Sequence, residues 1–228
     1  MIRVKQLTKT FGNHTAVDGV TLAVARQESL AVVGPSGSGK TTLLRLIAGL
    51  EKPDRGEVFI GDRVVSSPLK IVAPHKRGIG FVFQEPALWP HLNVAQNILF
   101  GLQHLSHQEG RKRLVEVLEH TNLTGFENRF PDEISGGEAR RVTIARAVAP
   151  RPACLLMDEP LINLDPELKK RMRGIIRDVI EDSGATLIYV THDPTEAVQL
   201  SGRIIELRGG RIVGEVEGKR HAMTVSYE

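Results

Sequence analysis

The apolar residues change their spacing several times along the chain, and each spacing predicts a different element. Alternating or unbroken apolar runs are typical of β-strands, and an unbroken run indicates a strand buried on both faces. An alternating tail at residues 203–217, with Gly209 and Gly210 at its centre, predicts a hairpin. We expect the other strands at residues 2–4, 19–24, 29–33, 57–60, 78–83, 153–157 and 186–190.

Helical spacing predicts four main helices between these strands. One follows the glycine-rich segment at residues 34–42 and ends near Gly49, and a second follows the capping-box pair Ser106 and Glu109. A third extends from residue 135 to 149, and a charged fourth covers residues 166–182. Strands that alternate with helices favour an α/β core, which is interrupted here by a helical insert at roughly residues 85–150.

Composition narrows the class without naming a function. The 228 residues are 41% hydrophobic and 25% charged, close to globular averages, which excludes a disordered or fibrous chain. Aromatic residues make up only 4%, so the core must consist mainly of Val, Ile, Leu and Ala. A net charge of +3 is too small to indicate nucleic-acid binding, and one cysteine excludes an internal disulfide. The longest apolar runs, of about five residues, are far shorter than the roughly 20 that a membrane span needs.

The most specific motif is the segment Gly34–Thr41, GPSGSGKT, which matches G-x-x-x-x-G-K-[ST] between a strand and a helix. Glycines at these positions let backbone N–H groups surround a polyphosphate at a helix N-terminus. Lys40 can reach the β- and γ-phosphates, and the Thr41 hydroxyl can bind Mg²⁺. The alternative, an ordinary glycine-rich turn, does not explain this strand–loop–helix context. The motif therefore predicts nucleotide binding, but it names no reaction.

Two further polar clusters follow the strand and helix patterns. Asp158 and Glu159 end the buried run at 153–157, where α/β sheets bind ligands. Asp158 suits Mg²⁺, and Glu159 suits a general base that acts on water. Ser135-Gly-Gly-Glu138 opens a helix and predicts a second anion site. The alternatives are surface charges at a strand end for the first cluster and a plain helix cap for the second.

Together these motifs resemble the ATP-binding cassette ATPases, and the resemblance covers roughly residues 1–215. It implies an α/β fold: a P-loop NTPase core with a mixed sheet, an N-terminal antiparallel β subdomain and an inserted α-helical subdomain. We therefore expect one cassette over residues 1–228, with the core at 1–84 and 151–228 and the helical part at 85–150. The ordered residues that carry the resemblance are Phe11, Gly34–Thr42, Gln84, Ser135–Glu138, Leu155–Glu159, Leu164-Asp165 and His192.

The resemblance also implies roles for individual residues. ATP is expected to stack on Phe11, with Val17 near the ribose, and to bind through Gly34, Pro35, Ser36, Gly37, Ser38, Gly39, Lys40, Thr41 and Thr42. Thr41, Gln84 and Asp158 are the expected Mg²⁺ residues, and Lys40, Glu159 and His192 the catalytic ones. Ser135, Gly136, Gly137 and Glu138 are expected to contact ATP on a second copy of the chain, and Asp165 to lie at that dimer interface.

Simpler interpretations of several of these residues stay open. Phe11 could fill the core, Gln84 could be a polar residue at a strand end, and His192 could belong to a helix cap. Asp165 followed by Pro166 has the pattern of an N-cap with proline at the first helical position. Trp89 could be a core residue of the helical insert rather than an interface anchor.

Residues 81–97 and 159–165 are similar to bacterial importer ATPases of the sugar, polyamine, iron and molybdate group. That similarity implies a peripheral subunit at the cytoplasmic face of the membrane, with permease subunits and an extracytoplasmic binding protein as partners and with no nucleic acid. We expect Leu88, Trp89 and Pro90 near the groove that receives the permease. The alternatives are an exporter or release-system ATPase, or a cytosolic cassette that acts on nucleic acid.

The sequence departs from this family's pattern at two positions. Ile162 stands where the family usually has Ser, and Glu138 stands where many members have Gln. Glu138 adds a negative charge beside the expected phosphate, unless Arg140 or Arg141 offsets it. Importers of this group commonly carry a C-terminal regulatory domain, and we expect a short cassette without one.

Overall fold

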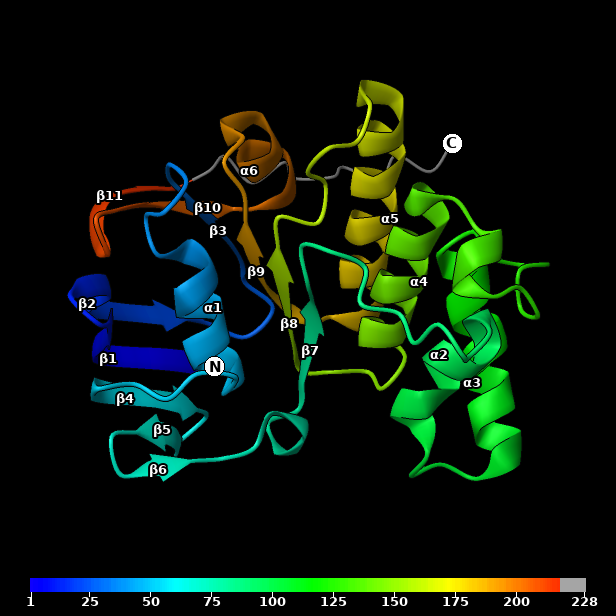
Figure 1. Cartoon of the computed structure of the whole chain (residues 1–228), viewed down its shortest axis with the longest axis horizontal. Coiled ribbons are helices and arrows are strands. Elements are labelled where there is room, and N and C mark those ends of the chain that lie inside the picture. The colour runs from blue at the N-terminus through cyan, green and yellow to red at the C-terminus, as the bar shows by residue number, and fades with distance from the viewer. Residues whose placement is uncertain (218–228) are drawn as a thin grey trace, which may run out of the picture.

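A computed structural model describes residues 1–217 of the chain as two β-sheets and a set of helices (Figure 1). One sheet has five strands in the order β2-β1-β4-β5-β6, and the other has six in the order β11-β10-β3-β9-β8-β7. The strands are β1 (Ile2–Phe11), β2 (His14–Val24), β3 (Ser29–Val33), β4 (Arg55–Ile60), β5 (Arg63–Ser67), β6 (Lys70–Ile71), β7 (Ile79–Val82), β8 (Cys154–Asp158), β9 (Thr186–Val190), β10 (Arg203–Arg208) and β11 (Arg211–Glu217). The α-helices are α1 (Lys40–Ala48), α2 (Val94–Leu99), α3 (His107–His120), α4 (Gly136–Val148), α5 (Pro166–Ser183) and α6 (Pro194–Leu200).

The six-stranded sheet is mixed and forms the centre of the molecule. Strands β10, β3, β9, β8 and β7 pair in parallel, and β11 joins β10 antiparallel. All residues of β8 and β9 are buried, as their unbroken apolar sequences predict. The register pairs Val190 with Val32 on one side and with Asp158 on the other. The carboxyl ends of β3, β9 and β8 therefore meet at one edge of the sheet.

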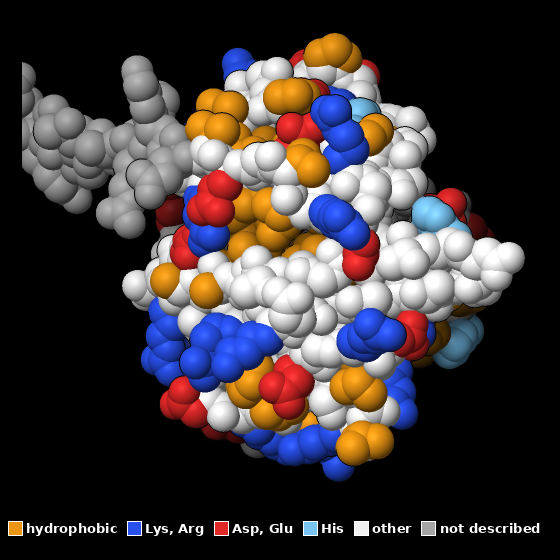
Figure 2. Space-filling view, turned by 90° about the vertical axis from the view of Figure 1, so that its left-hand side faces the viewer, with side chains coloured by type: hydrophobic (Ala, Val, Ile, Leu, Met, Phe, Trp, Pro, Cys, Tyr) orange, Lys and Arg blue, Asp and Glu red, His pale blue; other side chains and the backbone are white. Residues whose placement is uncertain are grey.

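The five-stranded sheet is antiparallel and packs across α1. Apolar residues on alternate positions of β2 face inward, so Val20, Leu22 and Val24 are buried. Helix α1 lies between the two sheets in Figure 1 and buries Leu43, Leu44 and Ile47. Lysine and arginine side chains on the outer side of this region are interspersed with acidic and hydrophobic ones (Figure 2), and several are paired, as Arg3 is with Asp62 and Lys9 with Asp54.

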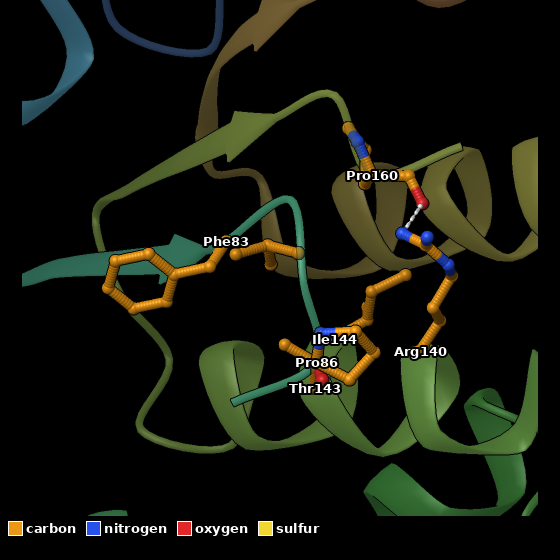
Figure 3. Close-up of a pocket in the computed structure, with 7 residues that line it drawn as sticks. Phe83, Pro86, Arg140, Thr143, Ile144 and Pro160 are labelled. Atoms are coloured by element: carbon orange, nitrogen blue, oxygen red, sulfur yellow. Dashed lines mark hydrogen bonds between the residues drawn. The ribbon is translucent and has the colours of Figure 1, made fainter. Parts of the chain in front are cut away.

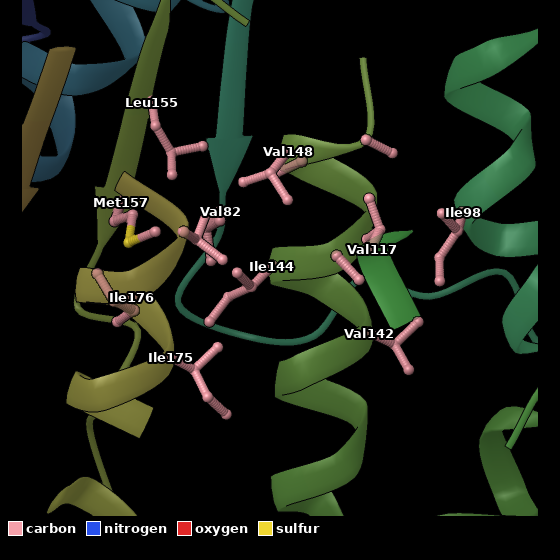
Figure 4. Close-up of a cluster of buried hydrophobic side chains, with 14 of the residues drawn as sticks. Val82, Ile98, Val117, Val142, Ile144, Val148, Leu155, Met157, Ile175 and Ile176 are labelled. Carbon is pink, nitrogen blue, oxygen red and sulfur yellow. The ribbon is translucent and has the colours of Figure 1, made fainter. Parts of the chain in front are cut away.

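A second apolar cluster joins the other side of the six-stranded sheet to the helices. Helix α5 and helix α4 cover this side, and α2 and α3 lie beyond α4 (Figure 1). Val82 of β7, Met157 of β8, Ile144 of α4 and Ile176 of α5 point toward one another (Figure 4). None of the helices in residues 1–217 combines the length and the apolar character that a membrane crossing requires.

The predicted fold class is confirmed: an α/β chain with a mixed central sheet and an antiparallel N-terminal sheet. Helices α2, α3 and α4 lie within the predicted insert at 85–150, but the division at residues 84 and 151 stays a prediction. The last part of the predicted core segment, residues 218–228, lies outside the described residues. The sequence patterns missed β6, α2 and α6, which are too short to repeat an apolar period clearly, and β5, whose sequence RVVSS neither alternates nor forms an unbroken apolar run.

Arg77, two residues before β7, joins α1 to the five-stranded sheet through a buried guanidinium. It donates hydrogen bonds to the backbone oxygens of Val72 (2.8 Å), Ile47 (2.8 Å) and Val65 (3.0 Å), and to Ser66 Oγ (2.7 Å). These acceptors belong to α1, to β5 and to the chain after β6. Burial lowers the pKa of Arg77 to about 10, which still leaves the group charged at neutral pH.

We predict that Arg77→Met lowers the free energy of unfolding by roughly 3–5 kcal/mol, because three buried carbonyls and a hydroxyl each lose a hydrogen bond. Urea denaturation followed by circular dichroism measures the change. Arg3→Met is the matched control: its partner Asp62 is fully exposed, so we expect a change within about 0.5 kcal/mol. Equal midpoints for the two variants would contradict a structural role for Arg77.

Candidate nucleotide-binding and catalytic site

A cavity of about 590 Å³ opens at the edge where the parallel strands end. It lies between the β1–β2 turn, the glycine-rich loop before α1 and the segments that follow β7, β8 and β9. It brings together most of the predicted ATP, Mg²⁺ and catalytic residues, although they are far apart in sequence. Its lining residues are Phe11, His14, Ala16, Ser36, Gly37, Ser38, Gly39, Lys40, Thr41, Thr42, Gln84, Glu159, Ile162 and His192.

Two glycines of the loop are required by close backbone contacts. Gly39, the N-cap of α1, has φ 101°, and a Cβ there would lie 2.0 Å from the Ala16 oxygen. Gly34 has φ 152°, and a Cβ there would lie 2.1 Å from the Leu207 oxygen. Only glycine fits these positions. The loop therefore packs tightly against β2 and β10 and directs the N-terminus of α1 at the cavity, where its partial positive charge favours an anion.

Lys40 and Thr41, in the first turn of α1, reach across to the loop and to β8. The Lys40 ammonium, almost fully buried, donates to the oxygens of Gly34 (2.9 Å) and Pro35 (3.0 Å) and lies 3.7 Å from Glu159 Oε1. The Thr41 hydroxyl donates to Asp158 Oδ1 at 2.9 Å. One turn of helix therefore places a cation and a hydroxyl against the two carboxylates that end β8.

Glu159 turns out of the sheet with unusual backbone geometry. Its φ of 45° is left-handed, which non-glycine residues seldom adopt and which marks sites where the surrounding structure fixes a side chain. Its N–H still donates to the Val190 oxygen at 3.0 Å, so the turn is anchored to the end of β9. Glu159 Oε2 lies 3.2 Å from His192 Nδ1. Lys40, Glu159 and His192 thus form a continuous row of contacts at the cavity.

Asp158 differs from Glu159 in its environment. It is 4% exposed, and this burial raises the pKa of its carboxyl above the ordinary value. The hydrogen bond from Thr41 opposes that rise, whereas the negative charge of Glu159 adds to it. A buried carboxylate that is held by a hydroxyl and lacks full solvation favours an added cation.

The expectation that Val17 lies near the ribose requires a correction. The Phe11 side chain is 46% exposed and lines the cavity, so it does not fill the core. The Lys9 ammonium lies 5.2 Å from its ring centroid. Val17, in contrast, is fully buried in the cluster around α1, and its neighbour Ala16 lines the cavity instead. Successive residues of a strand face opposite sides, so the residue near a ribose would be Ala16, not Val17.

His14 is a cavity residue that the sequence reasoning missed. It pairs with Phe11 across the tight β1–β2 turn, which places both side chains at the same end of the cavity. The hairpin register was the signal that could have found it.

The Ser135–Glu138 segment lies outside this cavity. Ser135 is the exposed N-cap of α4: its Oγ accepts from the Glu138 N–H (3.3 Å), while Glu138 Oε2 accepts from the Ser135 N–H (2.7 Å). That backbone bond is the main reason why the pKa of Glu138 is lowered. Arg141, not Arg140, faces Glu138, at 4.0 Å. Asp165 caps α5, accepting from the N–H groups of Glu167 and Leu168, and is exposed.

A buried acid behind His192 was also missed. Glu196, 3% exposed in the first turn of α6, accepts from the hydroxyls of Thr191 (2.8 Å) and Tyr189 (2.9 Å) and pairs with Lys169 of α5 (3.0 Å). Thr191 in turn accepts from the Asp193 N–H. This network holds the residues on both sides of His192.

Sequence comparison agrees with this geometry. A profile of the family described as ABC transporter matches residues 17–162, more than half of the chain. An iron(III) import ATP-binding protein, FbpC, of Mannheimia succiniciproducens is 43% identical over 95% of this chain and 61% of its own length. A sulfate/thiosulfate import ATP-binding protein, CysA 1, of Agrobacterium fabrum is 43% identical over 92% of this chain and 62% of its own length. The chain thus spans about three-fifths of the length of these relatives.

Solved structures show the same fold. The cassette MJ0796, in a dimeric post-hydrolysis state bound to ADP and Pi, is 34% identical with a TM-score of 0.85, covering 95% of this chain and 98% of its own. CbiO1 of Clostridium perfringens, part of the ABC transporter complex cbiONQ, is 26% identical with a TM-score of 0.85, covering 96% and 88%. With the cavity, the two sheets and the family profile in agreement, the chain belongs to the ABC transporter family.

Proposed function

We propose that this chain binds and hydrolyses ATP as the motor subunit of a membrane importer. The observation that carries the proposal is the row of contacts from Lys40 to Glu159 to His192 beside a phosphate-binding loop. That row brings three groups into one cavity: a cation that can bind phosphate, a carboxylate that can bind water, and an imidazole that can contact both. Its relatives with importer names, and a neighbour captured with ADP and Pi, support the same reaction.

The polar groups around Thr41 suit a magnesium ion that accompanies ATP. A hydroxyl and a carboxylate already touch, at 2.9 Å between Thr41 and Asp158, and Gln84 adds an amide at the same cavity. These are hard oxygen donors and few in number, as expected for an ion that also takes phosphate oxygens and water. Mg²⁺ would neutralise charge on the phosphates. Asp158 would gain the countercharge that its burial demands.

Lys40, Glu159 and His192 divide the remaining chemistry. Lys40 donates to backbone oxygens of the loop, and the same ammonium can donate to the terminal phosphates of ATP. Glu159 presents a carboxylate that can accept a proton from an attacking water, and His192 beside it can donate to a phosphate oxygen. Water then attacks in line, and the bond to the leaving ADP oxygen breaks.

A second copy of the chain would complete each site. Ser135 and Gly136, at the start of α4, are exposed, yet neither lines the cavity of its own chain. Asp165 and the cavity residue Ile162 lie on the same loop, between β8 and α5. A head-to-tail pair would bring the α4 start of one chain to the phosphates bound by the other. The dimeric MJ0796 structures support this arrangement.

An apolar groove of about 220 Å³ offers a docking site for a permease. It is lined by Ala48, Leu50, Pro74, His75, Ile79, Phe81 and Phe83. Phe83 directly precedes the cavity residue Gln84, so an apolar helix seated in the groove would contact the chain next to the nucleotide. Trp89 lies farther along the same segment and does not line this groove; it is partly buried, and its ring packs tilted against Phe100, with 4.2 Å between centroids. We infer that the groove receives a cytoplasmic segment of a permease.

The remaining features of the transport system rest on similarity. The two relatives named above import different ions at the same identity, so similarity to the cassette does not select a substrate. By the same similarity we infer an extracytoplasmic binding protein as a further partner, with this ATPase at the cytoplasmic face of the membrane. The adjacent coding sequences test import directly: a multi-span permease together with a secreted binding protein means import.

We predict that Glu159→Gln lowers ATP turnover by about 100-fold or more, since the amide cannot accept the proton of water, while ATP binding persists. With ATP and Mg²⁺ the variant should then accumulate as a dimer in size-exclusion chromatography with light scattering. The double variant Lys40→Ala/Glu159→Gln is the control and should stay monomeric. A monomeric Glu159→Gln protein at saturating Mg-ATP would count against the closed dimer.

We predict that Asp158→Asn raises the melting temperature of the nucleotide-free protein and abolishes turnover. The folded-state pKa of Asp158 is raised, so its ionised form destabilises the fold at neutral pH, and this penalty fades as pH falls. Each 1 kcal/mol recovered should add roughly 2–4 °C. Scanning calorimetry at pH 8 and pH 5 measures the melting temperature. Asp165→Asn is the control and should change it little, because Asn also caps helices. A lower melting temperature for Asp158→Asn at pH 8 would refute the electrostatic explanation.

We predict that Leu50→Asp removes permease binding without affecting the nucleotide site, because it charges an exposed side chain of the groove. Copurification from detergent-solubilised native membranes, with mass spectrometry to identify a multi-span protein, should fall at least tenfold. Turnover of the isolated chain should stay within twofold. Leu69→Asp, at a 96% exposed leucine, is the control. Equal recovery of the multi-span protein with both variants would place the permease elsewhere.

A further inference from the structure

Arg140 of α4 makes contacts that the proposed mechanism does not use. One of its guanidinium nitrogens donates to the backbone oxygens of Gln84 (2.9 Å) and Pro160 (3.0 Å), and the other donates to the oxygen of Ile162 (3.0 Å). Figure 3 shows Arg140 extending from α4 to Pro160 beside a small pocket that Phe83, Thr143 and Ile144 line. A single side chain thus joins α4 to two separate segments.

Both segments end in residues of the nucleotide cavity. Gln84 follows β7, and Pro160 follows Glu159 at the end of β8. The β7–β8 ladder reaches only to the pair Val82 and Met157, so these residues lie beyond the regular sheet bonds. Arg140 makes hydrogen bonds to both segments beyond this last pair. Its guanidinium thus bridges the backbone of the expected Mg²⁺ residue, Gln84, and that of Pro160, the residue after the expected general base.

The loop after β8 also needs external support. Glu159 and Asn163 both have left-handed backbone angles, with φ of 45° and 58°. Such angles persist at non-glycine residues only where the surroundings hold them. Within the loop, the Ile162 N–H donates to the Glu159 oxygen at 3.2 Å. Arg140 adds two charge-assisted bonds between these strained residues, which are stronger than neutral ones.

A second arginine ties the same segment to α4 farther along. Arg146 donates to the Ala87 oxygen at 2.7 Å, and its guanidinium lies 5.1 Å from the ring centroid of Trp89. The segment from Gln84 to Trp89 is therefore attached to α4 at two points, and α4 begins at Ser135, which faces outward. Burial lowers the pKa of both guanidinium groups, and both remain charged at neutral pH.

We propose that Arg140 is a positioning residue that fixes Gln84 and Glu159 relative to each other and links both to the movement of α4. The proposal rests on the proposed ATP hydrolysis for its kinetic part. Its structural part does not: there, a nucleotide that shifts the cavity also shifts the Trp89 segment, because Arg140 bonds to Gln84 and Arg146 to Ala87 of that segment. Trp89 is the only tryptophan of the chain, so its fluorescence reports this segment alone.

The test compares Arg140→Met with a matched control, Arg113→Met. Arg113 likewise donates to two backbone oxygens, those of Ala149 (2.9 Å) and Val148 (3.0 Å), but these lie at the far end of α4. Both methionines keep an apolar stem and remove the donors. The kinetic measurements are kcat and KM for ATP. Calorimetry gives the dissociation constant of Mg²⁺ in the presence of a non-hydrolysable ATP analogue, and fluorescence gives the change in Trp89 emission on adding that analogue.

For Arg140→Met we expect kcat to fall by about tenfold or more, since the base and the Mg²⁺ residue lose their fixed spacing. The dissociation constant should stay within threefold, and the Trp89 response should drop below a third of that of the original chain. Arg113→Met should keep kcat and the Trp89 response within twofold. Arg140→Lys, with a single compact donor group, should recover only part of kcat.

The proposal is overturned if Arg140→Met keeps kcat within twofold of Arg113→Met, or if its Trp89 response is undiminished. An original chain that binds the analogue but never hydrolyses ATP would refute the proposed function alone. The fluorescence comparison would still decide the role of Arg140. A Trp89 signal that does not respond to the analogue in the original chain would refute the link through Arg140.

Discussion

The parallel pairing of β3, β9 and β8 is the constraint on which the site depends. Val190 pairs with Val32 and with Asp158, so the loop at Gly34, the acid at Glu159 and the imidazole at His192 all begin within two residues of one ladder end. Strands β8 and β9 are buried on both faces. A slip in register would draw Asp158 into the apolar interior or leave apolar residues at the cavity. Burial of the strands therefore fixes the geometry of the polar groups.

Much of this site could be predicted because its requirements are local. Gly34 and Gly39 of the phosphate loop are imposed by contacts under 2.5 Å that any Cβ would make, so the motif tolerates little variation there and is easily recognised. The acids after β8 follow an unbroken apolar run, which locates them at a sheet edge. The α/β class followed from the same runs, whereas the mixed sheet and the antiparallel subdomain followed from the resemblance. In each case a few consecutive residues contain the physical reason.

The failures arise where the reason lies elsewhere in the chain. The β1–β2 pair shifts register between Leu7 and Lys9 and again between Lys9 and Thr10. Counting alternate residues along β2 therefore could not show whether Ala16 or Val17 faces the cavity. Arg140 and Glu196 are charged residues on helices, and for such residues the sequence pattern alone predicts side chains that are exposed to solvent. Arg140 bonds to the oxygens of Gln84 and Ile162, and Glu196 bonds to Tyr189 and Lys169. These partners come together only in the folded chain.

The cap of α4 gives the Glu138 departure a specific meaning. Glu138 Oε2 already accepts the Ser135 N–H, one of the donors with which a helix start attracts an anion. In the proposed dimer, a phosphate held by the other chain would have to share or displace that carboxylate. The helix start therefore carries its own counter-anion, so in the proposed dimer an incoming phosphate would meet the repulsion of the Glu138 carboxylate before it reached the helix N-terminus.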